Sequence, residues 1–65
     1  MYKDILNTLR QYPGLRKREL SAILHIPLMD VVIMVSELEK IGKVYSKPYR
    51  DFANMEYYDK YYATK

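Results

Sequence analysis

The sequence predicts a small α+β domain in which three short helices are followed by a two-stranded β-hairpin. Apolar residues recur at helical spacing along residues 2–41. Beyond Gly42 this spacing gives way to a valine and six tyrosines, residue types that favour strands. With 65 residues and no cysteine, the chain is expected to form one domain, residues 1–65, stabilised by packing alone.

The first two helices are predicted from apolar stripes that end at proline. The first covers about residues 2–12 and ends at Pro13 and Gly14. Its stripe consists of Tyr2, Ile5, Leu6, Leu9 and Tyr12. The second helix covers about residues 16–25 and ends before Pro27. Its shorter stripe consists of Leu20, Ile23 and Leu24.

The third helix is predicted over about residues 28–41, with Gly42 as its left-handed C-terminal cap. Five of its residues are expected to face the core: Val31, Met34, Val35, Leu38 and Ile41. His25 lies in the turn before this helix.

The hairpin is predicted over about residues 43–63. Pro48 has no backbone N–H and therefore fits only an edge strand. Tyrosine pairs across the strands are expected to stabilise the sheet by about 0.2 to 1 kcal/mol each. A helix remains the alternative for residues 52–63, because four residues also satisfy helical spacing: Phe52, Met55, Tyr58 and Tyr62.

The segments ELSAILHI and VSELEKIGKV, joined by a tight turn, resemble the winged helix-turn-helix family of bacterial transcription regulators. The matching residues are Glu19, Leu20, Leu24, His25, Ile26, Leu38, Glu39, Lys40, Gly42 and Val44. The resemblance implies a winged helix-turn-helix fold that contacts double-stranded DNA with the start of its second helix, its third helix and its wing. It also implies a positive φ at His25, where the family's turn often has Gly and which histidine tolerates better than most residues. The layout is also similar to the very small, single-domain regulators of pilus and fimbrial operons.

Basic residues are the candidates for phosphate contact in a chain with a net charge of +3. The predicted DNA-binding set is Arg16, Lys17, Arg18, Lys40, Lys47 and Arg50. The first three crowd onto a helix N-terminus, where the dipole disfavours each cation by about 0.3 to 1 kcal/mol, and a bound phosphate would offset this cost. The alternative is a solvated charge run. Arg16 also replaces the Ser or Thr cap usual in the family, so only the Glu19 half of a capping box is expected.

The third helix carries no Lys, Arg, Asn or Gln between Pro27 and Glu39, although these side chains make most of the specific hydrogen bonds to base edges. Its outward face instead carries Met29, Val32 and Ile33. Three interpretations stay open for these residues. They contact thymine methyl groups, they bind a protein partner, or another segment covers them as part of the core.

The predicted function is a small DNA-binding transcription regulator, to which a second regulatory protein can add specificity. The alternative is a protein-interaction module that uses the apolar face of the third helix. No catalytic residue, cofactor, metal site or small-molecule substrate is predicted, because the chain has one His, no Cys and no Gly-rich phosphate loop. We expect a cytoplasmic protein that is not an enzyme, because neither a membrane span nor a signal peptide is recognisable.

Overall fold

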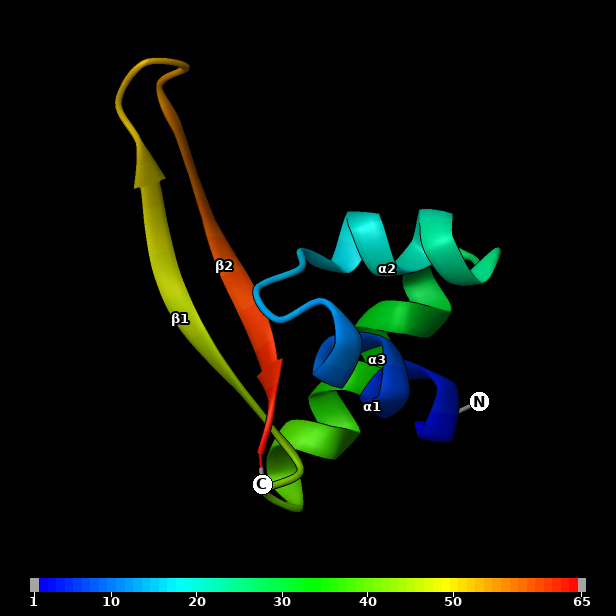
Figure 1. Cartoon of the computed structure of the whole chain (residues 1–65). Helices are drawn as coiled ribbons and strands as arrows, with labels where there is room; N and C mark the ends of the chain where they lie inside the picture. The colour runs from blue at the N-terminus through cyan, green and yellow to red at the C-terminus, as the bar shows by residue number, and fades with distance from the viewer. Residues whose placement is uncertain (1, 65) are drawn as a thin grey trace.

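The structure, a computed structural model, describes residues 2–64, and these residues form three helices followed by an antiparallel hairpin (Figure 1). The elements are α1 (Tyr2–Gln11), α2 (Lys17–Leu24), α3 (Leu28–Lys40), β1 (Val44–Asp51) and β2 (Glu56–Ala63). The predicted α+β class and order of elements are therefore confirmed, and the helical alternative for residues 52–63 is wrong. Residues 1 and 65 of the predicted domain lie outside the described residues.

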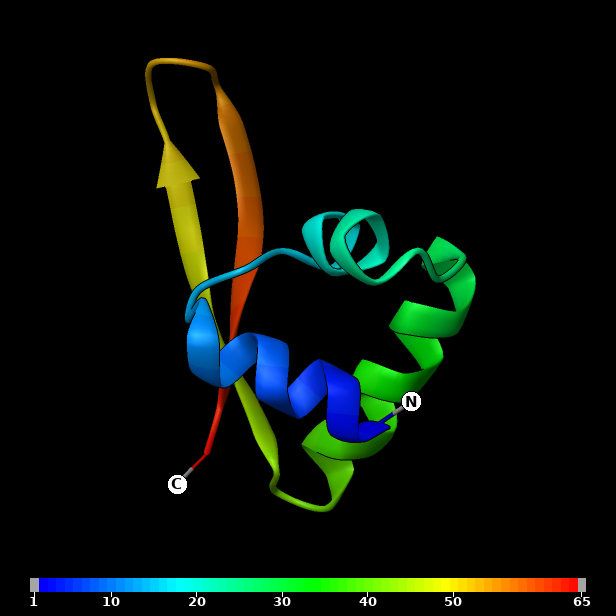
Figure 2. The ribbon, with the colours of Figure 1, turned by 45° about the vertical axis from the view of Figure 1, so that its right-hand side comes forward.

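The core lies where the helices meet the base of the hairpin. Its fully buried side chains come from all three helices: Ile5, Leu9, Leu20, Val31 and Val35. The strands add Val44 and Tyr61 to the same cluster. Figures 1 and 2 show the other end of the hairpin projecting beyond the helices. Only the base of the hairpin therefore contributes to the core.

Ile41 does not belong to the core, contrary to the prediction from helical spacing. α3 ends at Lys40, and Ile41 is 67% exposed at the rim of a shallow groove that Tyr2 and Leu6 also line. The chain then turns at Gly42, whose φ is +76°. Three other stripe residues are also exposed: Tyr2, Tyr12 and Ile23. Spacing gives the face of a helix on which a residue lies, but not whether another element reaches that residue.

The left-handed turns predicted at both ends of α3 are present. His25 has a φ of 55°, and its backbone N–H donates to the Ser21 carbonyl, which closes α2. Gly42 donates its N–H to the Glu39 carbonyl at 3.1 Å. Histidine is one of the residues that adopt this conformation at modest cost. These two turns fix the direction in which α3 enters and leaves the core.

The hairpin is attached to the helices by the segment that precedes α2. The Gly14 N–H donates to the Tyr61 carbonyl at 3.0 Å, and the Tyr61 N–H donates to the Leu15 carbonyl at 2.8 Å. The backbone groups of Tyr61 thus point away from β1, so Tyr61 and its partner Ser46 form a pair without hydrogen bonds to each other. Two residues further along each strand, Asp59 and Pro48 form another such pair. Pro48 therefore faces the outer edge of β1, where its missing N–H removes no bond of the ladder.

Leu20→Ala is expected to lower the free energy of unfolding by about 2 to 5 kcal/mol, because the side chain is completely buried and its loss leaves a cavity. Ile41→Ala, at an exposed position, is expected to change it by no more than about 0.5 kcal/mol. Urea denaturation followed by circular dichroism measures both values. Similar losses in the two variants would show that Ile41 contributes to the core after all.

Candidate nucleic-acid interface

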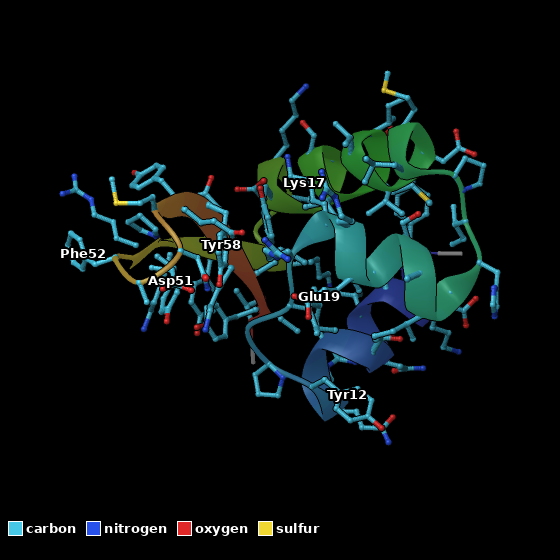
Figure 3. The ribbon with its side chains drawn as sticks, turned by 90° about the horizontal axis from the view of Figure 1, so that it is seen from above. Tyr12, Lys17, Glu19, Asp51, Phe52 and Tyr58 are labelled. Carbon is cyan, nitrogen blue, oxygen red and sulfur yellow. The ribbon has the colours of Figure 1, made fainter. Side chains whose placement is uncertain are left out.

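An open groove of about 590 Å³ lies between the hairpin and the N-terminal ends of α2 and α3. Residues 16–18 supply one wall, and residues 56–59 of β2 supply the opposite wall. Leu28 and Val32 of α3 also line it. Figure 3 shows Lys17 and Tyr58 on these two sides. The groove thus brings together segments that are about forty positions apart in the sequence.

Arg16 closes the start of α2 through its backbone rather than its side chain. Its φ of −85° and ψ of 161° are extended, and its N–H donates to Oε1 of Glu19 at 2.9 Å. A guanidinium has no acceptor for the amide of the third helical residue, so the reciprocal bond of a capping box is not made. The half capping box expected from the sequence is therefore confirmed.

The side chain of Arg16 is committed to contacts within the chain. Its guanidinium lies 4.4 Å from the centre of the Tyr58 ring, and its Nη1 is 3.4 Å from Oε2 of Glu56. Its Nε is 3.7 Å from Oε1 of Glu19. These contacts offset the unfavourable position of the cation at a helix N-terminus. Arg16 thus joins α2 to the hairpin, and a phosphate reaching it has to compete with two carboxylates.

Lys17 and Arg18 line the groove and Arg50 lies beside it, and none of the three has a carboxylate partner among the ion pairs of residues 2–64. The Lys17 ammonium lies 5.5 Å from the centre of the Tyr61 ring, and Arg18 is exposed. Arg50 lies 5.5 Å from the ring of Tyr57, which itself lines the groove. These three predicted DNA-binding residues therefore face the same region.

Lys47 and Lys40 lie away from this region. Alternate residues of a strand point to opposite faces, so Lys47 lies on the face of the hairpin opposite to that of Arg50. Lys40 is at the other end of α3, about 18 Å along the helix axis from Leu28. The structure therefore brings Arg16, Lys17 and Arg18 together in the groove and places Arg50 beside it, and it separates Lys47 and Lys40 from them.

The face of the hairpin that carries Lys47 consists of stacked tyrosines and lysines. Tyr45 stacks on Tyr62 and Tyr49 packs on Tyr58, each pair with ring centres 5.2 Å apart. Between these pairs, Lys47 lies opposite Lys60. The Lys60 ammonium is 4.1 Å from the centre of the Tyr49 ring. The cross-strand tyrosine pairs predicted from the sequence are therefore present, one at the base of the hairpin and the other, Tyr49–Tyr58, in the part that projects from the helices.

The outward face of α3 is open at its N-terminal half. Met29 is 69% exposed and Ile33 is 51% exposed, so the interpretation of these two residues as core is wrong. Val32 is half-buried and lines the groove beside Leu28. The reason is that the hairpin packs against the base of the helices and its upper part does not fold over this end of α3. An apolar helix face is therefore available to a ligand.

The tip of the hairpin is an ordered loop that sequence analysis did not single out. Oδ1 of Asp51 accepts hydrogen bonds from the N–H groups of Ala53 and Asn54 at 3.1 and 3.3 Å. Its Oδ2 accepts one from the Asn54 side-chain amide at 2.8 Å. The aspartate before a turn was the available sequence signal, because such residues often bond to the backbone two or three positions further on.

A second groove, of about 370 Å³ and mostly apolar, lies between the start of α1 and the end of α3. The Tyr2 hydroxyl donates to Oε2 of Glu37 at 2.7 Å, and this bond raises the pKa of Tyr2. Lys43 and Ile41 also line this groove. With one cation beside one carboxylate, it offers phosphate groups no concentration of positive charge.

Among residues 2–64, no single helix is long and apolar enough to cross a membrane, although α2 and α3, bent by 117°, have that length and composition as a pair. The same residues contain no group of three or more His, Cys, Asp or Glu side chains placed to hold a metal ion.

Comparison with known proteins adds no relative. No protein-family model matches the chain, and no curated protein or solved structure is significantly similar to it. The functional assignment therefore depends on the side chains around the groove.

The Asp51 carboxyl is expected to titrate below 3.8, the usual value for aspartate, because hydrogen bonds from Asn54 and Ala53 lower its pKa. A lowered pKa in the folded state means that this carboxylate orders the tip above pH 3.8 and that the effect is lost as the pH falls further. The amide chemical shifts of Ala53 and Asn54 report it in an NMR titration. A midpoint at or above 3.8 would contradict the loop geometry.

Proposed function

We propose that this chain is a winged-helix domain that binds double-stranded DNA, as a small transcription regulator does. One observation carries the proposal. The start of α2, residues Leu28 and Val32 of α3 and residues 56–59 of the hairpin border a single groove, although they are remote in sequence, and the exposed face of α3 with Met29 and Ile33 lies next to these two α3 residues along the helix. A duplex needs this kind of surface, because a helix in the major groove has phosphate backbones on both sides.

In this proposal α3 enters the major groove with the residues near its N-terminus. The groove of B-DNA is about 12 Å wide and accepts an α-helix. Met29 and Ile33 are exposed there, and apolar side chains can contact the C5-methyl group of thymine. Hydrogen bonds to base edges are a smaller part of recognition, since this face of α3 lacks the side chains that usually make them.

The cations beside α3 are placed to contact phosphates. Lys17 and Arg18 lie on one side of the groove and Arg50 on the other. Asp59 also lines the groove, so the surface is not uniformly positive. Three phosphate contacts imply a modest salt dependence, with a slope of about −2.7 in log affinity against log salt, at about 0.9 per contact. Specific binding then depends on the apolar contacts or on a partner.

Arg18→Ala is expected to weaken binding to a duplex of random sequence and to reduce the salt slope by about 0.9, because one phosphate contact is lost. Lys3→Ala is the matched control, since Lys3 is an exposed cation on α1 that does not line the groove. Fluorescence anisotropy at several salt concentrations measures both variants. Binding without salt dependence, or equal effects of the two substitutions, would contradict the proposal.

A protein-interaction module is the second candidate function, and the exposure of Met29 and Ile33 is the observation that favours it. Burial of each side chain against a partner contributes about 1.5 to 3 kcal/mol before the costs of association. The two functions are compatible, because a partner bound at this end of α3 can add specificity to weak DNA binding.

Ile33→Asp is expected to leave the thermal transition nearly unchanged but to abolish binding through α3, because it adds a carboxylate to an exposed apolar face. Ile41→Asp makes the same change at an exposed isoleucine beyond the other end of α3 and should retain binding. Circular dichroism and anisotropy measure the two properties. If Ile33→Asp unfolds the protein, this face of α3 is part of the core and the proposed contact is wrong.

A further inference from the structure

We propose that the hairpin tip is a DNA-bending wedge in which Phe52 and Met55 insert between base pairs from the minor groove. This inference rests on the proposed DNA binding and goes beyond it, because binding through α3 alone requires neither residue. The tip lies at the end of the hairpin furthest from the helices, where Figure 3 shows Phe52.

Both apolar residues at the tip are highly exposed. Phe52 is 79% exposed and Met55 is 89% exposed, more than any other large apolar residue among residues 2–64. A single exposed apolar residue is ordinary on a protein surface. Two such residues within one four-residue loop form a concentrated apolar tip. Although the core of this chain is small, these two apolar side chains do not contribute to it.

The loop at the tip has an ordered and partly strained conformation. Met55 has a φ of +57°, in the left-handed region, where glycine or asparagine costs less. Asp51 meanwhile holds the loop in shape through three hydrogen bonds. The sequence thus keeps a methionine where another residue would favour the turn, on a loop that is already ordered. A conformational cost of this kind is commonly retained at functional positions.

The hairpin is long enough to carry its tip from the helices to a neighbouring DNA groove. From Ser46 to Asp51 the strand extends about 17 Å at the usual rise of about 3.4 Å per residue. This is close to half of the roughly 34 Å helical turn of B-DNA. With α3 in the major groove, the tip can therefore reach the neighbouring minor groove. The Tyr49–Tyr58 pair stiffens the hairpin within this span, and the Tyr45–Tyr62 pair lies at its base.

The tip combines apolar side chains with a neighbouring cation, which suits the minor groove. Phe and Met are among the apolar side chains that unstack base steps and bend the duplex by about 20 to 90°. Arg50 adjoins the loop, and the minor groove attracts cations by its negative potential. Of the neighbouring carboxylates, Glu56 pairs with Arg16, and Asp51 keeps its negative charge but directs its oxygens to the N–H groups of the loop. This combination favours a nucleic acid over an apolar pocket of a protein.

The dimensions of the minor groove require the duplex to bend. It is about 6 Å wide, whereas two strands about 4.8 Å apart need additional room for their side chains. The ribbon itself therefore cannot enter an undistorted minor groove. Only the loop residues reach the bases, and their insertion opens the groove and kinks the duplex. Flexible steps such as TA should be the preferred sites, because they are easily unstacked.

The test uses the full chain and a duplex of about 30 base pairs with a central TA step and fluorophores at its two ends. Energy transfer between the ends reports bending, and anisotropy reports affinity. The wild-type protein should increase energy transfer. Phe52→Ala should remove the increase and lower affinity about tenfold, while the salt slope stays unchanged because no phosphate contact is lost.

Two further variants separate the wedge from effects on folding. Met55→Gly should also reduce bending, although the glycine relieves the left-handed φ and should not lower the melting temperature. Tyr12→Ala is the matched control for Phe52→Ala, because it removes an exposed aromatic ring at the end of α1, far from the tip (Figure 3). It should leave both bending and affinity unchanged.

The outcomes distinguish the wedge from DNA binding itself. Salt-dependent binding with no change in energy transfer would overturn the wedge and leave the proposed function intact. Bending that persists in Phe52→Ala would also overturn it. Absence of binding would overturn both proposals. Binding to anionic lipid vesicles that Phe52→Ala abolishes, with the duplex unbent, would assign the tip to a lipid surface instead.

Discussion

The pairing between Leu15 and Tyr61 is the contact on which the rest of the structure depends. A two-stranded hairpin is marginally stable by itself and needs a further strand or a helix to pack against. Two backbone hydrogen bonds join β2 to the segment before α2, and the Tyr61 ring is buried in the core. Arg16 follows directly and extends the attachment to Tyr58 and Glu56. The position of the hairpin relative to α2 and α3 follows from these contacts.

This attachment has a consequence for the proposed site. Because Arg16 serves the structure, the positive charge that faces a ligand is smaller than the sequence RKR indicates. In the proposed function, DNA binding then depends on Lys17, Arg18 and Arg50, together with the apolar face of α3. A surface of this kind binds duplexes weakly in general and gains most from contacts that select particular bases, from bending, or from a partner. The two proposals made for α3 and for the tip are therefore parts of one arrangement.

Much of the fold could be predicted from local features. Periodicity predicted the order of the elements, and backbone sterics predicted the roles of Gly42 and Pro48, whereas the left-handed turn at His25 was predicted from the family resemblance. Ile41 shows the limit of periodicity, since its exposure depends on how far α1 extends over the end of α3. If residues 47–50 form a strand, Lys47 and Arg50 must point to opposite faces of it. Which of these faces the helices cover became clear only from the structure.

The role of Arg16 was harder to predict, because its partners are about forty positions away and no local pattern connects them. A helix dipole argument correctly identified a conflict at this position. It could not say whether a phosphate or the chain itself would offset that conflict. The exposed tip was missed for a related reason, since Phe52 and Met55 also fitted a helical spacing that would have buried them.

The central claim is that one surface, formed by the start of α2, the exposed half of α3 and the hairpin, binds duplex DNA. The most direct test is to add a random duplex to isotopically labelled protein and follow the backbone amide shifts by NMR. The account predicts shift changes at Lys17, Arg18, Ile33 and Arg50, with no change in the groove near Ile41. Absence of changes at low salt, or changes confined to the groove near Ile41, would contradict it.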